Sequence, residues 1–485
     1  MFQFYDEIDE LGTCDINWDY WKKCIPFYDA YKLWRRGSEY ILSEGYQRSK
    51  NTGVGIIDPV PFGGVLRQLP GITWAVGFIP RIYVFSGTKS NLETIAEYGE
   101  RFEDQRAREP HDRVRQATDA ITIVNLVGEE AKIEKQKIRK NLSSQKVFQC
   151  AKQLGTDISA LWDDQWSLQD NVTFVGATLI GQCFLGVQKF PKHYISLIRE
   201  ANNLIAAGDA TTWEFAEMKA QMIAMSNSIL GEQAKEILEA NGYVCSQFAL
   251  DGDESLEEAT EKLKLSHSGA GFLVESNLSF ILMLALAHIS VSPLILKKLL
   301  EEINSFEDIT LSSLKKMDYL DCIYRETIRF SSPTAVVPRV ASVICTMNVE
   351  NNNKEKSICT VYPNSYLFFA IRSIHHDRDL WKDPHLYNPI RFMPDVKDKK
   401  LHFIGENYFP FSAGKRACPA GNIFVEYAFK GFIFEFFKKN SLILDTDLES
   451  ISGSAIHPRW KKEYYARLTN NLIVEHEEVI NKNTI

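Results

Sequence analysis

The sequence predicts a mainly α-helical protein with a minor β-sheet, and three observations support this fold class. Apolar residues recur at helical spacing over long stretches, most clearly from about 268 to 303, with a break near Ser292 and Pro293. Residues 336–370 alternate between apolar and polar side chains around a turn at Glu350–Asn353, which predicts short strands. The composition of 45% apolar and 24% charged residues is that of an ordinary soluble globular protein.

The remaining elements follow from local patterns. Residues 81–86 predict a strand, and Ser90 is the candidate N-terminal cap of the helix that follows. The acidic stretch 246–262 predicts a surface connection, and the tail after residue 440 contains short strand-like runs. The segments with helical character are 27–48, 90–98, 128–170 and 171–245.

Charge and cysteine usage exclude some functional classes. The net charge of −8 argues against general nucleic-acid binding. The nine cysteines form no CxxC pair, and an odd, unpatterned count in a chain of 485 residues indicates reduced thiols. This usage predicts a cytoplasmic location.

No segment has the pattern of a membrane span. The acidic N-terminus lacks an apolar core, so neither a signal peptide nor a transmembrane anchor is predicted. Glu275 and His288 interrupt the apolar stretch 269–291, which is better interpreted as a buried core helix. The apolar run 53–84 is broken by Pro and Gly. It could touch a membrane surface peripherally, line a substrate mouth, or simply be a packed loop.

The most informative segment is residues 411–421, FSAGKRACPAG, which places one thiol between a glycine turn and an apolar helix predicted from Gly421 to Lys438. Helix N-terminal amides and nearby cations lower the pKa of a cysteine and favour a metal-binding thiolate. Gly414 permits a tight turn, and the Arg416 guanidinium suits a carboxylate. The alternative is a buried structural cysteine in a turn.

This loop resembles the haem-binding signature FxxGxRxCxG of the cytochrome P450 superfamily. Phe411, Gly414, Arg416 and Cys418 match, whereas Ala420 stands where the signature has Gly. The resemblance implies that Cys418 is the axial ligand of haem b (iron protoporphyrin IX) and that Arg416 holds a haem propionate. A cysteine thiolate in this position pushes electron density onto the iron and favours O–O cleavage.

Two further motifs upstream strengthen the resemblance. Glu326 and Arg329 lie three residues apart in a predicted helix, where their side chains can pair. Any exposed helix can contain such a pair, but here the segment Pro389–Phe392 follows with Arg391. Together they resemble the Glu-Arg-Arg triad of the superfamily, which implies a buried structural network and no catalytic role.

Two basic positions resemble propionate-binding positions of the superfamily. Arg339 lies in the segment VPRV, which resembles a strand whose Arg contacts a propionate, although a surface Arg is the alternative. Lys135 stands where an Arg is expected at the start of the third helix, and it lacks the bidentate fork. The basic run 132–140 is either a solvated face or a docking patch for an acidic electron donor.

The distal helix departs from the family pattern. Counting back from Pro293, the position of the usual Thr holds Asn277, and the position of the usual acid holds Ser276, with Glu275 before it. A one-residue slip would instead equate Glu275 and Ser276 with the acid and the alcohol that deliver protons during dioxygen activation. Asn277 resembles the branch containing cholesterol 7α-hydroxylase and prostacyclin synthase, a monooxygenase and an isomerase.

The resemblance covers about 80–485 and implies the cytochrome P450 fold in one haem-enclosing domain, 1–485. Within it, 1–80 is a loosely matched mouth region, 268–303 the distal helix and 405–440 the Cys loop with its helix. The implied function is monooxygenation of a small, mainly apolar substrate with electrons from a ferredoxin or flavoprotein reductase. The alternatives are a redox-partner-independent isomerase or dehydratase acting on a peroxide, and a non-catalytic haem-binding module.

Overall fold

The structure is a computed structural model that describes most of the residues from 255 onward and selected ranges before them. Within helix 256–290, the side chains of 262–276 are not described. The described ranges are 29–30, 32–33, 40–60, 81–101, 128–185, isolated helical residues between 195 and 228, 255–341, 343–363, 365–393, 407–414, 417–444, 448, 452–453, 458–459 and 463–470.

The chain divides into two compact units, which are described separately. Unit 1 comprises residues 1–107, 335–377 and 412–416, and unit 2 comprises residues 108–334, 378–411 and 417–485. The single haem-enclosing domain over 1–485 stays a prediction.

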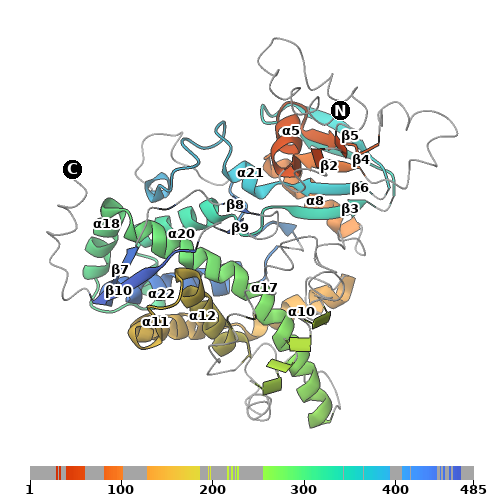
Figure 1. Cartoon of the computed structure of the whole chain (residues 1–485). Helices are drawn as coiled ribbons and strands as arrows, with labels where there is room; N and C mark the ends of the chain where they lie inside the picture. The colour runs from red at the N-terminus through yellow and green to blue at the C-terminus, as the bar shows by residue number, and fades with distance from the viewer. Residues whose placement is uncertain are drawn as a thin grey trace, which may run out of the picture. The chain divides into compact units, whose positions relative to one another are not determined.

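Unit 1 is built on a four-stranded sheet with the order β1-β2-β6-β3 (Figure 1). The parallel pair is β2 with β6, and the other pairs are antiparallel. A separate antiparallel hairpin of β4 and β5 closes at the predicted turn after Glu350. The strands are β1 Val54–Ile57, β2 Ile82–Phe85, β3 Val337–Ala341, β4 Cys345–Glu350, β5 Lys356–Val361 and β6 Ser365–Phe369.

The strands β1 and β2 form the two ends of the apolar run 53–84. Every residue of β2 is buried, and Ile57 and Val60 at the other end are buried as well. These two ends of the run are therefore packed in the core, as expected if the run is a packed segment and not a membrane-contacting one. Residues 61–80 lie outside the described ranges.

The helices of unit 1 are η1 Ile41–Gly45, α5 Tyr46–Thr52, α8 Lys89–Arg101 and α21 Ile371–His375. The predicted cap at Ser90 is wrong, because Ser90 lies inside α8. Thr88 precedes the helix, and its hydroxyl accepts a hydrogen bond from the amide of Asn91 at 3.2 Å. The aromatic residues that suggested a helix over 27–48 (Phe27, Tyr31 and Trp34) lie outside the described residues.

Unit 2 is helical around one apolar core, with small sheets at its C-terminal end. Its helices are α10 Gly128–Asn141, α11 Ser144–Leu161, α12 Leu168–Ile180, η2 Gly181–Leu185, α17 Leu256–Ser290, α18 Pro293–Asn304, α19 Leu311–Leu314, α20 Asp318–Ser331, η3 Pro389–Phe392, η5 Gly421–Val425 and α22 Glu426–Lys439. Its strands are β7 Asn440–Leu444, β8 Ser452–Gly453, β9 Pro458–Arg459 and β10 Ala466–Asn470.

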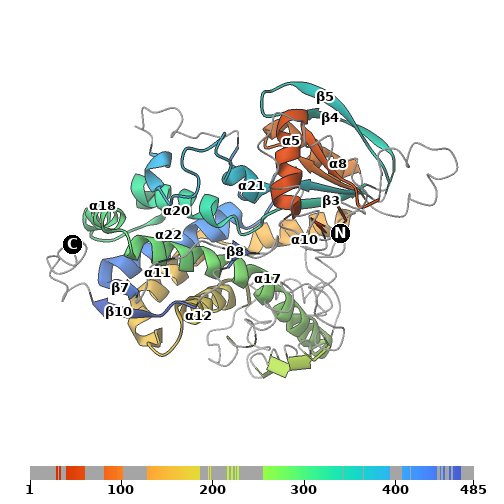
Figure 2. The ribbon, with the colours of Figure 1, turned by 45° about the horizontal axis from the view of Figure 1, so that its top comes forward.

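Close helix contacts organise the core of unit 2. Figures 1 and 2 show α11 beside α22 and α12 beside α17. At Gly155, an added Cβ would lie 2.8 Å from the carbonyl oxygen of Phe432, so the glycine lets α11 and α22 approach. At Gly176, an added Cβ would lie 2.1 Å from the Ser279 hydroxyl, which sets the approach of α12 to α17.

The long helix begins earlier than the sequence pattern predicted. α17 starts at Leu256, so the prediction of a start near 268 and of a surface connection continuing to 262 is wrong. Ser255 and Glu258 form a capping box. The Ser255 hydroxyl accepts a hydrogen bond from the Glu258 amide, and the Glu258 carboxylate accepts one from the Ser255 amide. This cap begins the helix in a stretch too acidic to show an apolar face. The predicted break at Ser292 and Pro293 is confirmed.

Among the described residues, no single helix is long and apolar enough to cross a membrane. The pair Asn277–Ser290 and Pro293–Asn304 passes a test of length and composition together, with a bend of 103° between them.

We expect His288 to make the stability of unit 2 dependent on pH. Its ring stacks on Tyr387 at 4.5 Å and meets Phe330 edge-on at 5.1 Å. Burial lowers its pKa from 6.5 to about 4. The folded state therefore prefers neutral imidazole, while the unfolded state binds a proton below about pH 6.5. We expect full stability above this pH and a loss of about 3 kcal/mol as pH falls from 6.5 to 4.

The measurement is denaturant unfolding of the wild type and of His288→Phe, which keeps the ring but cannot titrate. The two free energies should differ least at pH 7.5, and the wild type should lose more as the pH falls to 4. Parallel pH profiles for the two proteins would contradict the assignment to His288.

Candidate functional site

The loop that carries Cys418 is closed by its own backbone. The amide of Cys418 donates to the carbonyl of Phe411 at 2.9 Å. Gly414 has φ +68°, which confirms the predicted tight turn, since L side chains avoid this region. An added Cβ at Gly421 would lie 2.6 Å from the Phe411 ring. The signature has Gly at position 420, where this chain has Ala420. The next residue, Gly421, has to be glycine because the ring of Phe411 leaves no room for a side chain.

The helix after the loop begins with a wide π turn. The carbonyl of Ala420 accepts from the amides of Ile423, Phe424 and Val425 at 2.7–3.2 Å. The predicted helix over 421–438 is confirmed as η5 followed by α22. The amides of Ala420 and Gly421, which precede this ladder, donate to the sulfur of Cys418 and favour its thiolate.

Burial nevertheless raises the pKa of Cys418 above its ordinary value, although those amides and Lys135 act in the opposite direction. The amides and the nearby cation therefore act in the expected direction, and burial outweighs them. The cause is desolvation by the protein packed around the thiol, which the loop sequence does not show. A metal ion would have to supply the missing stabilisation and release the proton on binding.

The side chain of Cys418 keeps accessible surface even though protein atoms surround it densely. This surface leaves an open direction at the sulfur, which a metal ligand needs. An accessible, desolvated thiol with two amide donors fits the axial ligand of a haem iron, the cofactor that the cytochrome P450 resemblance implies.

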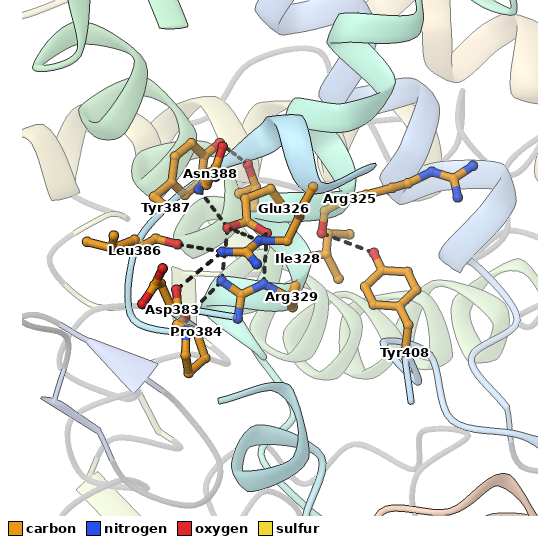
Figure 3. Close-up of polar contacts among 12 residues, drawn as sticks. Arg325, Glu326, Ile328, Arg329, Asp383, Pro384, Leu386, Tyr387, Asn388 and Tyr408 are labelled. Carbon is orange, nitrogen blue, oxygen red and sulfur yellow. Dashed lines mark hydrogen bonds and ion pairs between the residues drawn. The ribbon is translucent and has the colours of Figure 1, made fainter. Parts of the chain in front are cut away.

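Glu326, Arg329 and Arg391 lie together in unit 2, buried to 1% exposure or less. Figure 3 shows Glu326 beside Arg329. Arg329 Nε donates to Glu326 Oε2 at 2.7 Å, and its Nη2 donates to Oε1 at 2.9 Å. Arg391 Nε donates to Glu326 Oε1 at 3.1 Å, and the Asn388 amide donates to the same oxygen at 2.7 Å. One carboxylate thus holds two guanidinium groups.

Backbone carbonyls offset the excess positive charge of this network. Arg391 donates to the carbonyls of Lys382, Asp383 and Leu386 at 2.9–3.3 Å, and Arg329 donates to that of Pro384 at 2.9 Å. Figure 3 labels three of these partners, Asp383, Pro384 and Leu386, beside Glu326 and Arg329. Sequence reasoning missed segment 382–388 as a partner, because carbonyl ligands leave no signature in residue type. Arg329 also lies 5.3 Å from the centre of the Trp381 ring.

The other predicted site residues have the following positions. Arg339 lies on β3, is 8% exposed, and donates from Nη1 to the Pro338 carbonyl at 2.7 Å. Lys135 is half-buried on α10, and its charge acts on Cys418. Asn277 is half-buried on α17. Arg416 and the side chains of Glu275 and Ser276 lie outside the described residues.

The basic run 132–140 is partly neutralised by its own helix. Lys132 pairs with Glu129 at 2.9 Å and Lys137 with Glu134 at 3.5 Å. Arg139 and Lys140 are exposed at the C-terminal end of α10, where positive charge also complements the helix dipole. Both the solvated face and the docking patch remain compatible with this arrangement.

Comparison with known proteins supports the fold and shows a partial match to one family. Residues 255–447 match the sequence model of the family Cytochrome P450. A solved zebra fish cytochrome P450 structure with abiraterone shares the fold, with a TM-score of 0.59 and 14% identity over 81% of this chain and 94% of that one. The chain therefore has the cytochrome P450 fold, mostly helical with minor sheets, as predicted.

Plant proteins are among the relatives by sequence. Cytochrome P450 71B34 of Arabidopsis thaliana is 23% identical over 59% of this chain and 62% of its own length. The (S)-1-hydroxy-N-methylcanadine 13-hydroxylase of Papaver somniferum is 26% identical over 42% of this chain and 35% of its own. The chain thus spans less than two thirds of these relatives. They do not support the likeness of Asn277 to the cholesterol 7α-hydroxylase and prostacyclin synthase branch.

Proposed function

We propose that this protein is a haem-thiolate monooxygenase, because residues 255–447 match the Cytochrome P450 family model and the chain has the cytochrome P450 fold. The observation that carries the proposal is the accessible Cys418 thiol, to which the amides of Ala420 and Gly421 donate. The substrate would be a small, mainly apolar molecule that receives one atom of dioxygen. The other atom leaves as water, with two protons and two electrons from a donor.

The proposed cofactor is haem b, which supplies dioxygen chemistry when bound. Cys418 would be its axial ligand, Phe411 and Gly414 would shape the ligand loop, and Arg416, Arg339 and Lys135 would hold propionates. Glu326, Arg329 and Arg391 would have a structural role. A cytoplasmic location and a ferredoxin or flavoprotein reductase as electron donor belong to the same proposal.

The decisive test combines a spectrum with a turnover assay. Reduced protein with carbon monoxide should show the red-shifted band of a thiolate ligand. Consumption of reduced nicotinamide cofactor through a reductase should match the product formed. Product from a hydroperoxide without electron input would support the isomerase instead. If a screen of fatty acids, sterols, terpenoids and peptides gives no turnover and no substrate-induced spectral shift, only the non-catalytic haem-binding module remains.

Asn277 is the proposed distal residue, with Ser276 and Glu275 beside it. Its amide can donate a hydrogen bond and anchor water, but it cannot supply a proton as an acid does. In a monooxygenase, Asn277→Leu should uncouple the reaction, so that reduced cofactor is consumed and peroxide is released. The measurement is peroxide release and cofactor use in one assay.

Asn277→Thr provides the matched control, because Thr is the usual residue at this position of the resemblance and should stay coupled. Unchanged coupling in Asn277→Leu would favour the slipped alignment, in which Glu275 and Ser276 have these roles. Lost turnover in a peroxide assay without any cofactor would indicate an isomerase.

The basic run 132–140 is proposed as the docking patch for the electron donor. Charge reversal at Lys140, which is exposed on α10, should slow reduction and flatten its dependence on salt. Lys137→Glu should do the same and would also repel Glu134. Stopped-flow reduction over a range of ionic strength is the measurement. Lys297→Glu on α18 is the control, because Lys297 is also exposed. Equal rates in all variants would contradict the docking role.

A further inference from the structure

A buried lysine joins the helix of the Glu326 network to the helix that follows the Cys418 loop. Lys430 lies on α22 and is 5% exposed. Its Nζ donates to Asp321 Oδ1 at 2.7 Å and to Glu426 Oε1 at 2.8 Å. Asp321 belongs to α20 and Glu426 is the first residue of α22, so one ammonium group connects the two helices.

Aromatic rings surround the same ammonium group. Lys430 Nζ lies 5.3 Å from the centre of the Tyr324 ring on α20, and that ring lies 5.4 Å from the ring of Phe429 on α22. An ammonium group has three N–H groups, and here two of them go to carboxylates while the face of a ring attracts the cation. These partners are side chains of two helices that pack together, so the cluster specifies how α20 lies against α22.

Both helices lead directly to the candidate site. Glu326 follows Asp321 by five residues on α20, and Glu426 follows Cys418 by eight residues. The backbone is helical from Gly421 onward, because the residues at the junction of η5 and α22 keep right-handed helical φ and ψ angles. A continuous helix moves as a rod over this length, so a turn or shift of α22 would also move the loop that holds the thiol.

The contribution of this cluster to the free energy of unfolding is expected to be small. Losing one partner of a buried ion pair is costly when the other charge stays buried. The side chains of Asp321 and Glu426 are each 28% exposed, and Asp321 also pairs with Arg325 at 2.6 Å. Both carboxylates would therefore keep water if Lys430 were replaced by an apolar side chain of similar size. Such replacements are often neutral for stability, which leaves a defined geometry as the role of the ion.

We propose that Lys430 is a positioning residue that fixes α22 against α20 and thereby holds the Cys418 loop in place for its ligand. The inference rests on the proposed haem-thiolate function and adds a residue that belongs neither to the loop motif nor to the Glu326 network. Lys430 acts through the helix that follows the loop, and not by contact with the cofactor. Its loss should loosen thiolate ligation without unfolding unit 2.

The experiment measures ligation and stability separately in the full-length, haem-loaded protein. After reduction and addition of carbon monoxide, the red-shifted thiolate band is replaced in time by the shorter-wavelength band of haem that has lost its thiolate. Lys430→Met keeps the length of the side chain and removes its charge. We expect this replacement to be roughly tenfold faster, the effect of losing one hydrogen bond to a charged group. The midpoint of denaturant unfolding should stay close to that of the wild type.

The control variants separate the contact between the helices from its surroundings. Lys430→Arg should return the rate close to that of the wild type, because a guanidinium group can reach both carboxylates. Asp321→Asn should act like Lys430→Met, and the double variant should add little, because both changes remove one contact. Arg325→Ala removes only the exposed cation of Asp321 and should leave the rate unchanged. So should Lys439→Met on the same helix, where the side chain is 47% exposed.

An unchanged rate in Lys430→Met would overturn the proposal, and so would a faster rate that Lys430→Arg shares. A faster rate accompanied by an equally lowered unfolding midpoint would show that Lys430 is a structural residue only. If Lys430→Met does not fold, Asp321→Asn decides the question with the same two measurements. A wild type without any thiolate band would instead contradict the proposed function, on which this inference rests.

Discussion

Glu326→Ala should destabilise unit 2 by about 3–5 kcal/mol and yield haem-poor protein, because it leaves two buried guanidinium groups without their shared carboxylate. The carbonyls of 382–386 would still accept hydrogen bonds but cannot neutralise the charge. A domain is typically stable by only about 5–15 kcal/mol, so a large part of the stability of unit 2 is at stake. Denaturant unfolding and the ratio of haem to protein are the measurements.

Arg325→Ala is the matched control on the next residue of α20. Arg325 is half exposed and pairs with Asp321 at 2.6 Å, an interaction worth less than about 1 kcal/mol. Glu326→Gln separates charge from shape, because it keeps the side-chain volume and one acceptor oxygen. If Glu326→Ala unfolds at the same denaturant concentration as Arg325→Ala, the network does not have the structural role proposed.

The second large effect concerns the ligand itself. Cys418→Ser should abolish the red-shifted carbonyl band completely, because a serine hydroxyl does not ionise near neutral pH and cannot supply a thiolate. The surrounding fold should persist, since the Cys418 amide bond to Phe411 and the π turn at Ala420 involve only backbone atoms. The measurement is the difference spectrum of reduced protein with and without carbon monoxide, at matched protein concentration.

The control is Cys345→Ser, a half-buried thiol on β4 that should keep the band. A thiolate-type band that survives in Cys418→Ser would refute the whole assignment. A lost band accompanied by a lost circular dichroism spectrum would instead show that the variant is unfolded, and Cys418→Ala would then have to be compared.

The disagreement over the Cys418 pKa shows why local sequence and site electrostatics can differ. The loop supplies the donors that stabilise a thiolate, and these were correctly anticipated. The dominant effect is desolvation by burial, which depends on how the folded protein packs around the thiol. The same reason explains the missed carbonyl partners of Arg329 and Arg391, which come from residues 382–386.

Motifs of a few residues were predictable from sequence because their geometry is set by their own residue types. The positive φ of Gly414, the spacing of Glu326 and Arg329 on one helix face, and the alternation of β3 to β6 are of this kind. So was the end of the long helix before Pro293, because proline cannot continue a hydrogen-bonded helix from the preceding turn. These features were enough to identify the fold.

Only the tertiary structure decided which groups meet and how water is excluded from them. It surrounded His288 with Tyr387 and Phe330, which come from other parts of the chain. The physical reason is that contact and desolvation depend on packing between segments far apart in the chain, which periodicity and residue type do not encode. The sequence by itself determined the turn at Gly414 and the helix that follows the loop, because those depend on neighbouring residues alone.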